Sequence, residues 1–195
     1  MAEKRIILGS NSPRRRELMT GIGIPFTVDT GNTFEEKFSP ETPHALIPTL
    51  MSEGKSQGFH RPLEDDEILI TADTMVLLHD RGDKSPILGK PHSRDEAVAM
   101  LHELSGRTHE VITSVTIRSN GRKDTFSDST MVTFKALTDE EINYYIDNYQ
   151  PFDKAGSYGV QEWIGYVGIS GIQGSFYNVM GFPTHKVYEH LHAFM

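Results

Sequence analysis

Apolar and polar residues follow two different spacings along the chain, and these spacings predict strands that alternate with helices. Short apolar runs bounded by turn residues are typical of buried strands. They occur at residues 6–8, 26–28, 68–78, 109–117 and 125–136. An Asn-Gly pair at 120–121 separates the last two runs and predicts a hairpin turn. A second hairpin turn is predicted at residues 81–83, before the short segment 87–91.

Apolar residues at helical spacing follow most of these runs. Ser12 is the expected N-cap of a first helix with Pro13 at its first position, where the missing N–H of proline costs nothing. Ser93 and Thr138 are the expected N-caps of two later helices, and Glu141 completes a capping box with Thr138. The predicted helices cover residues 13–20, a segment from 44 that breaks near 62, 93–106, 138–149 and 184–193.

Two long segments have the composition of loops. Residues 29–43 are rich in Gly, Asn, Thr, Glu and Pro, which predicts a surface loop. Residues 153–174 contain six glycines and little periodicity, so we expect a loop-rich segment near a functional site. The chain has no internal repeat or linker. Interleaved strands and helices therefore predict one α/β domain over residues 1–195.

Composition narrows the class of protein. The chain has 195 residues, 37% hydrophobic content and a net charge of −8, which is ordinary for a globular domain and unfavourable for general nucleic-acid binding. It has no cysteine, which excludes disulfides and thiolate metal sites. We find no signal-peptide pattern and no apolar run of membrane-spanning length. We therefore expect a cytoplasmic protein with neither a membrane nor a nucleic-acid partner.

The first helix begins with an unusual concentration of positive charge. Residues 14–16 are all arginine, in the turn where the helix dipole is already positive. A strand, a small-residue turn and a helix N-terminus together present free backbone N–H groups, so a bound anion would relieve this conflict. Phosphate is the obvious candidate. The alternative is a solvated basic helix start.

Carboxylates and lysines elsewhere have the chemistry of a nucleotide site. Asp73 interrupts an apolar strand, Glu35 and Glu36 lie in the loop 29–43, and Lys90 and Lys154 lie beside small or rigid residues. Phosphoryl transfer needs cations, metal-binding carboxylates and a base for water. Each group has a simpler alternative: a strand-end aspartate bonded to backbone, a solvated loop pair, or solvated lysines. The P-loop and dinucleotide fingerprints are absent.

The ordered motifs resemble one known family. Residues 9–18 read GSNSPRRREL, which is similar to the S-x-S-P-R-R-x-E-L signature of the Maf nucleotide pyrophosphatases. Further segments match that family in order: ADTMV at 72–76, LGKP at 88–91, LSG at 104–106 with His109, Val111 and Thr113, DKAGSYGVQ at 153–161, and GSFYNVMGFP at 174–183. The resemblance covers essentially the whole chain, and the order of the motifs makes it specific.

The resemblance implies a fold and a reaction. The fold is the elongated α/β architecture of inosine-triphosphate pyrophosphatases, with a mixed, twisted central sheet flanked by helices, often as a homodimer. The reaction is hydrolysis of a nucleoside triphosphate to the monophosphate and pyrophosphate with a divalent cation, for which Mg²⁺ is expected and Mn²⁺ or Co²⁺ are alternatives. The implied branch acts on dTTP and UTP, because Gln161 stands where the branch acting on 7-methyl-GTP usually has glutamate.

The resemblance also assigns roles to individual residues. Asp73 is the proton acceptor, and Glu36, or Glu35 if the loop alignment slips by one, holds the metal together with Asp73. Base selection falls to Arg14, Thr74 and Gln161. The residues expected at the phosphates are Ser10, Ser12, Arg14, Arg15, Lys55, Lys90 and Lys154. Arg16 falls at the variable position of the signature and is expected to be solvated.

Several residues depart from the family pattern. Gly9 replaces the commoner alanine, and Lys55 lies in LMSEGKS where the family usually has L-A-x-x-K-A. Glu162 and Trp163 follow Gln161 in place of a usual glycine, next to the expected base pocket. Two rival functions stay open. One is a 7-methyl-GTP pyrophosphatase, and the other is a nucleotide-binding regulator of cell division without turnover.

Overall fold

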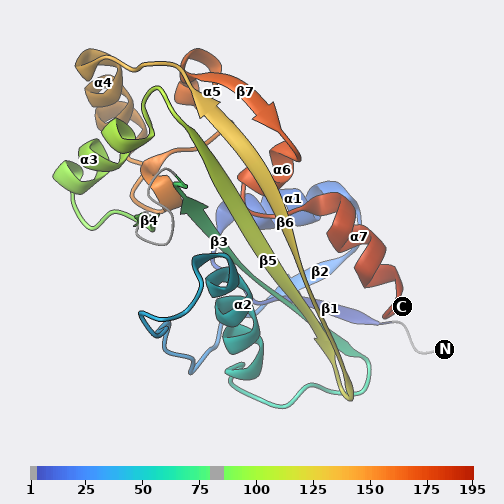
Figure 1. Ribbon diagram of the computed structural model, residues 1–195. Coiled ribbons are helices and arrows are strands. Elements are labelled where there is room, and N and C mark those ends of the chain that lie inside the picture. Colours follow the sequence, from blue (N-terminus) through green and yellow to red (C-terminus); the bar gives the residue numbers. More distant parts are fainter. Residues whose placement is uncertain (1–3, 80–85) are drawn as a thin grey trace. The chain divides into compact units, whose positions relative to one another are not determined.

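A computed structural model describes residues 4–79 and 86–195 (Figure 1). The hairpin turn predicted at 81–83 lies outside the described residues. The strands are β1 (Arg5–Leu8), β2 (Phe26–Val28), β3 (Glu67–Leu77), β4 (Ile87–Leu88), β5 (Thr108–Ser119), β6 (Arg122–Phe134) and β7 (Ile169–Gln173). The α-helices are α1 (Pro13–Ile22), α2 (Ile47–Gln57), α3 (Arg94–Leu104), α4 (Asp139–Tyr149), α5 (Trp163–Gly168), α6 (Phe176–Val179) and α7 (Thr184–His192). Two 3₁₀ turns are η1 (His44–Leu46) and η3 (Ala155–Ser157).

The described strands form a mixed sheet, as predicted. Their order is β2-β1-β3-β5-β6-β7, with β4 paired to β3. β1 runs parallel to both β2 and β3, whereas β4 and β7 are antiparallel to their neighbours. Parallel pairing of β1 with β2 requires a crossover, which α1 supplies. The α/β class is therefore confirmed. None of the helices in the described part of the chain has the length and apolar character of a bilayer span.

The chain divides into two compact units. The first contains Met1–Asp73, Thr113–Asp128 and Gly181–Met195, and the second contains Thr74–Ile112 and Ser129–Met180. Strands β3, β5 and β6 contribute residues to both units. The assignment of residues 1–195 to one domain stays a prediction.

In the first unit, one face of β6 packs against α7. His190 Nδ1 lies 2.7 Å from Asp124 Oδ2, and its ring stacks on Phe126 at 3.9 Å between centroids. Lys186 Nζ lies 2.7 Å from Asp128 Oδ1. These strand residues are spaced two apart, as the alternation of side chains in a strand requires. They fix the C-terminal helix on this face.

Ser127 on β6, together with Ser114 and Thr116 on β5, contacts α2 through hydroxyl groups. Thr49 Oγ1 lies 3.0 Å from Ser114 Oγ and 3.3 Å from Ser127 Oγ. One turn further along α2, Ser52 Oγ lies 3.0 Å from Thr116 Oγ1. Hydrogen bonds between hydroxyls tolerate little displacement, so this contact fixes the register of α2 on the sheet more narrowly than apolar packing would.

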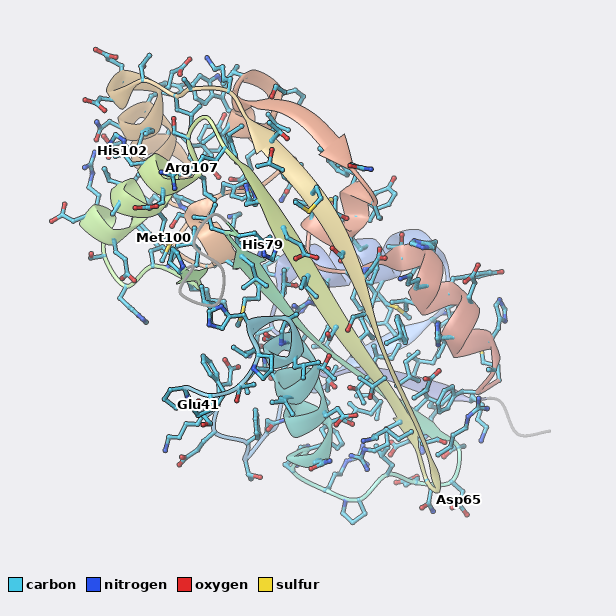
Figure 2. The ribbon with its side chains drawn as sticks, in the orientation of Figure 1. Glu41, Asp65, His79, Met100, His102 and Arg107 are labelled. Atoms are coloured by element: carbon cyan, nitrogen blue, oxygen red, sulfur yellow. The ribbon has the colours of Figure 1, made fainter. Side chains whose placement is uncertain are left out.

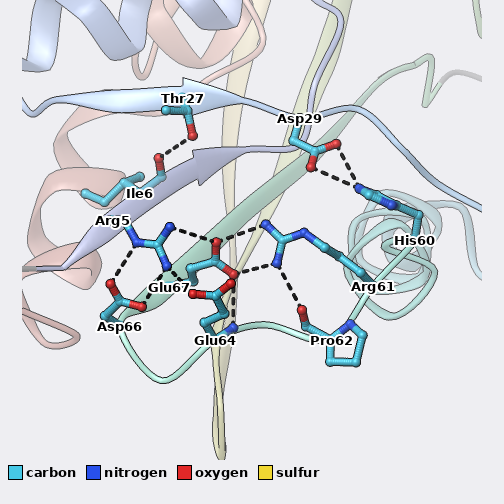
Figure 3. Close-up of polar contacts among 10 residues, drawn as sticks. All are labelled: Arg5, Ile6, Thr27, Asp29, His60, Arg61, Pro62, Glu64, Asp66 and Glu67. Carbon is cyan, nitrogen blue, oxygen red and sulfur yellow. Dashed lines mark hydrogen bonds and ion pairs between the residues drawn. The ribbon is translucent and has the colours of Figure 1, made fainter.

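A charged network ties together the starts of β1 and β3 in the same unit (Figure 3). Glu67 is 2% exposed and accepts two hydrogen bonds from the Arg61 guanidinium, at 2.6 and 2.9 Å. Its carboxylate also accepts from the backbone N–H of Glu64 at 3.0 Å. Arg5 donates to Asp66 at 2.7 Å and lies 3.6 Å from Glu67. The buried carboxylate of Glu67 is therefore fully paired.

The second unit has α3 packed against α4 and η3. Met100 lies on the face of α3 that contacts η3, where Ser157 Oγ donates to its sulfur at 3.1 Å, whereas His102 is exposed (Figure 2). Ser93 caps α3 by accepting from Glu96 N, and Thr138 and Glu141 form the predicted capping box of α4. These local capping predictions are confirmed.

The prediction that residues 153–174 are loop-rich is wrong in part. They include α5, which has only six residues, and β7, which pairs antiparallel with the end of β6. A helix of this length shows no apolar period. β7 is an edge strand whose residues are almost all exposed. It is held by backbone pairing, so its sequence does not show the alternation of apolar and polar residues that is typical of a half-buried strand.

Candidate active site

The turn between β1 and α1 has the predicted geometry. Ser12 caps α1, since its side chain accepts from the backbone N–H of Arg15. Gly9 lies close to β3, and a Cβ there would come within 3.0 Å of Thr71 Cγ2 and 3.2 Å of Leu69 Cδ1. Gly9, which replaces the family's alanine, therefore fits a narrow space beside β3. The helix continues to Ile22, two residues beyond the predicted end, and Gly23 terminates it with φ of 80°.

The three arginines of this helix start have different surroundings. Arg15 Nε donates to Gly181 O at 2.8 Å, and its Nη1 donates to Ser10 Oγ at 3.3 Å. Burial lowers the pKa of Arg15 to about 10, against the opposing effect of the Asp73 carboxylate, so the guanidinium stays charged at neutral pH. Arg14 is half-buried and Arg16 is exposed, which confirms the expectation for Arg16.

The centre of the site is a cation held between two carboxylates. Lys55 Nζ lies 2.6 Å from Asp73 Oδ1 and 2.9 Å from Glu36 Oε1. The side chain of Asp73 is 15% exposed and that of Lys55 is 20% exposed, whereas that of Glu36 is 61% exposed. Asp73 and Glu36 also act on the charge of Arg15. The first unit therefore brings together the helix start, the strand aspartate and the loop glutamate that the sequence left apart.

Aromatic packing positions the loop that carries Glu36. The ring of Phe34 lies against Gly54 on α2, where a Cβ would come within 2.2 Å of it. The loop backbone is held as well, since Thr33 N donates to Gly58 O at 2.8 Å and Asn32 Nδ2 donates to Lys55 O at 2.5 Å. Sequence reasoning missed Phe34 and Gly54. The glycine before Lys55 was the available signal, because it departs from the family pattern.

The two loop glutamates have different partners. Glu36 faces Lys55, whereas the Glu35 side chain is 75% exposed and pairs with Lys37. This geometry supports Glu36, and not Glu35, as the carboxylate that acts with Asp73.

The remaining predicted residues belong to the second unit. Thr74 follows Asp73 on β3, and Lys90 is exposed just after β4. Lys154 is only 8% exposed, and its Nζ lies 2.8 Å from Asp153 Oδ1 and 3.0 Å from Glu162 Oε1. In the described part of the chain, the buried Oε1 atom of Gln161 has no hydrogen-bond donor.

The donor set of Asp73 and Glu36 fits a hard divalent cation. Carboxylate oxygens are the ligands that Mg²⁺ prefers, and the Lys55 ammonium already occupies a position between them where positive charge is stabilised. Among residues 4–79 and 86–195, no group of three or more His, Asp or Glu side chains could hold a metal. The protein would thus supply two carboxylates and leave other positions to water and phosphate oxygens.

Comparison with known proteins agrees with the ordered motifs. Residues 5–194 match the model of the family described as Maf-like protein. The chain belongs to the Maf-like protein family. This membership accounts for the order in which the motifs occur, from the arginine-bearing helix start to the final Gly-Phe-Pro segment.

Curated members of the Maf-like family are similar over nearly their full length. A dTTP/UTP pyrophosphatase of Parabacteroides distasonis is 47% identical over 97% of this chain and 96% of its own. Proteins of the same name from Bacteroides thetaiotaomicron and Flavobacterium psychrophilum are 46% and 47% identical over 96% of this chain and 94% and 93% of their own. A solved HAM1 protein from Coxiella burnetii aligns with a TM-score of 0.48 and 11% identity, over 97% of this chain and 99% of that one.

Proposed function

We propose that this member of the Maf-like family hydrolyses dTTP and UTP to the nucleoside monophosphate and pyrophosphate. The observation that carries the proposal is the Lys55 ammonium between Asp73 and Glu36, in the same unit as the arginine-bearing start of α1. Phosphoryl chemistry needs a base, metal-binding carboxylates and phosphate-binding cations, and this cluster has all three. The names of the curated relatives support the substrates.

In the proposed reaction, Asp73 accepts a proton from the attacking water. The water oxygen forms a bond to the α-phosphorus, the bond from that phosphorus to the α–β bridging oxygen breaks, and pyrophosphate leaves. Ser10, Ser12 and Arg15 bind phosphate oxygens at the start of α1, and Lys55, Lys90 and Lys154 add positive charge. A divalent cation held by Asp73 and Glu36 would supply Lewis-acid stabilisation of the phosphates. Mg²⁺ is the expected ion, with Mn²⁺ or Co²⁺ as alternatives.

Selection of the base is proposed to involve Arg14, Thr74 and Gln161. The buried Oε1 of Gln161 is an acceptor without a donor among the described residues, and leaving it unpaired costs free energy. Thymine and uracil present an N3–H donor next to a carbonyl, which matches both ends of the glutamine amide. In the same amide orientation, cytosine would place its N3 acceptor opposite Oε1, and its N4 amino donor could pair with Oε1 only after the amide flips. This chemistry favours the dTTP and UTP branch.

Pyrophosphate release across a panel of triphosphates with Mg²⁺ tests the proposal. We expect dTTP and UTP to be hydrolysed fastest, and Asp73→Asn to lower turnover by about 10²- to 10⁴-fold because it removes the base and keeps the shape. Asp65→Asn, an exposed aspartate of the same unit, is the matched control. Preferential hydrolysis of 7-methyl-GTP would favour that branch instead. Binding of dTTP without pyrophosphate release with any divalent ion would favour a regulator.

Assembly and location stay predictions. A homodimer is tested by sedimentation equilibrium of the purified chain, and a cytoplasmic location by fractionation of the producing cells. Neither outcome alters the residues proposed for the reaction.

A further inference from the structure

The segment that carries Gln161 is a closed turn in the second unit. Glu162 N donates to Gly159 O at 3.0 Å, and Gly165 N donates to Glu162 O at 2.9 Å. There is no room for side chains at its glycines. A Cβ on Gly159 would come within 2.8 Å of the Glu162 carboxyl carbon, and one on Gly165 within 1.8 Å of Val160 O. Backbone hydrogen bonds thus close the turn that contains Gln161, and its two glycines lie close to Glu162 and Val160.

A single phenol joins the two ends of this turn. Tyr145, on α4, is fully buried. Its hydroxyl accepts from Gly159 N at 2.9 Å and donates to Glu162 Oε2. Burial raises the pKa of this phenol, so it keeps its proton and remains a donor. The Tyr145 hydroxyl and the Glu162 carboxylate form what we call the Tyr145–Glu162 clamp.

The second oxygen of Glu162 is also engaged. Its Oε1 lies 3.0 Å from Lys154 Nζ, which in turn lies 2.8 Å from Asp153 Oδ1. The side chains of Lys154 and Glu162 are 10% and 19% exposed, so this pair is poorly screened by water. Both carboxylate oxygens therefore hold Glu162 in place, one through Tyr145 and the other through Lys154.

We propose that Tyr145 and Glu162 are positioning residues for base selection, acting through the turn that presents Gln161. The inference rests on the proposed function, since it takes the Gln161 amide to contact the base. Glu162 stands where the family usually has glycine, which cannot close the clamp. The clamp holds the turn from which the Gln161 side chain extends, and selectivity for thymine and uracil over cytosine depends on how that turn presents the amide.

Binding of the product monophosphates tests the clamp, because no turnover intervenes. Calorimetry should show that the wild type binds dTMP more tightly than CMP. We expect Tyr145→Phe to reduce this ratio of affinities about tenfold, since it removes one hydroxyl and keeps the ring. Glu162→Ala should have the same effect, whereas Glu162→Gln keeps an acceptor for Tyr145 and should restore most of the ratio. Tyr149→Phe, a half-exposed neighbour on α4, should leave the ratio unchanged.

Parallel kinetics distinguish the clamp from a purely structural role. Tyr145→Phe should raise KM for dTTP about tenfold and change kcat by less than about threefold, with the dTTP to CTP ratio of kcat/KM falling accordingly. Loss of activity on all triphosphates alike, together with a lower Tm and an unchanged dTMP to CMP ratio, overturns the proposal. So does an unchanged ratio in both Tyr145→Phe and Glu162→Ala. Failure of the wild type to release pyrophosphate from dTTP or UTP counts against the proposed function alone.

Discussion

The Lys55 ammonium lies 2.6 Å from the Asp73 carboxylate and 2.9 Å from that of Glu36, so a side-chain cation occupies the space between the two carboxylates proposed to hold a metal. A divalent ion and the ammonium would compete for the same oxygens. Lys55→Met should therefore bind Mn²⁺ about tenfold more tightly than the wild type, and electron paramagnetic resonance of free Mn²⁺ measures this affinity. Pyrophosphate release by the same variant should fall about 10²-fold, because a phosphate-binding charge is lost.

Lys123→Met is the matched control for that comparison. Lys123 pairs with Glu53 on α2 at 2.9 Å, so its removal changes the net charge by the same amount without touching Asp73. Equal Mn²⁺ affinity in Lys55→Met and Lys123→Met would contradict competition at the two carboxylates.

Neighbouring glutamates of one loop should differ in their effect on metal dependence. Glu36 contacts Lys55, whereas Glu35 contacts Lys37 away from Asp73. Glu36→Gln should raise the Mg²⁺ concentration needed for half-maximal activity about tenfold or more, because one of two anionic ligands becomes neutral. Glu35→Gln should leave it within about twofold. A larger effect from Glu35→Gln, in a Mg²⁺ titration at saturating dTTP, would reverse the assignment.

The buried Glu67 should make folding sensitive to acid. Hydrogen bonds from Arg61 hold the pKa of Glu67 below its usual value of 4.5. The stabilisation is therefore present above pH 4.5 and is lost as the pH falls through the lowered folded value. Glu67→Gln should lower the free energy of unfolding at pH 7 by about 1–3 kcal/mol, and the difference from the wild type should shrink below pH 4.5. Urea unfolding from pH 7 to pH 3 measures both.

An exposed ion pair provides the comparison for Glu67. Arg94 and Asp147 lie 2.9 Å apart, but their side chains are 45% and 57% exposed. Asp147→Asn should cost less than about 1 kcal/mol at pH 7. If the two variants are destabilised equally, burial does not determine the strength of the Glu67 pairing.

Local signals in the sequence predicted the starts of α1, α3 and α4, whereas the features that the sequence did not predict depend on distant contacts. Ser12 and Thr138 cap their helices through residues three positions away, so a short window of sequence is sufficient. The position of Glu36 depends on the Phe34 ring against Gly54, which no local pattern encodes. β7 is held by backbone pairing with β6.

The same distinction applies to the candidate site. The family motifs named Asp73, Lys55 and Gln161, but motif spacing gave no sign that Lys55 bridges two carboxylates. Motif spacing also could not predict the contact between Tyr145 and Glu162. Tyr145 lies on α4, whereas Glu162 lies in a turn whose sequence has no regular apolar spacing. Pairings of this kind depend on tertiary packing.

Acid should also destabilise the second unit through His109. This residue is fully buried, its Nε2 lies 2.6 Å from the Tyr158 hydroxyl, and its ring stacks on Phe134. Burial lowers the pKa of His109 from 6.5 to about 3. Between these values the unfolded chain binds a proton that the folded chain does not, so stability falls as the pH drops below 6.5, by up to about 1.4 kcal/mol per pH unit.

Replacement of His109 by an amide tests this dependence. His109→Gln keeps a polar group near Tyr158 and removes the titration, so its free energy of unfolding should fall less steeply than that of the wild type between pH 6.5 and pH 5. His102→Gln is the control, because His102 is about half exposed on α3 and belongs to the same unit. Urea titrations at closely spaced pH values give the slopes. Parallel slopes for the wild type and His109→Gln would show that the folded protein protonates His109 as readily as the unfolded chain does.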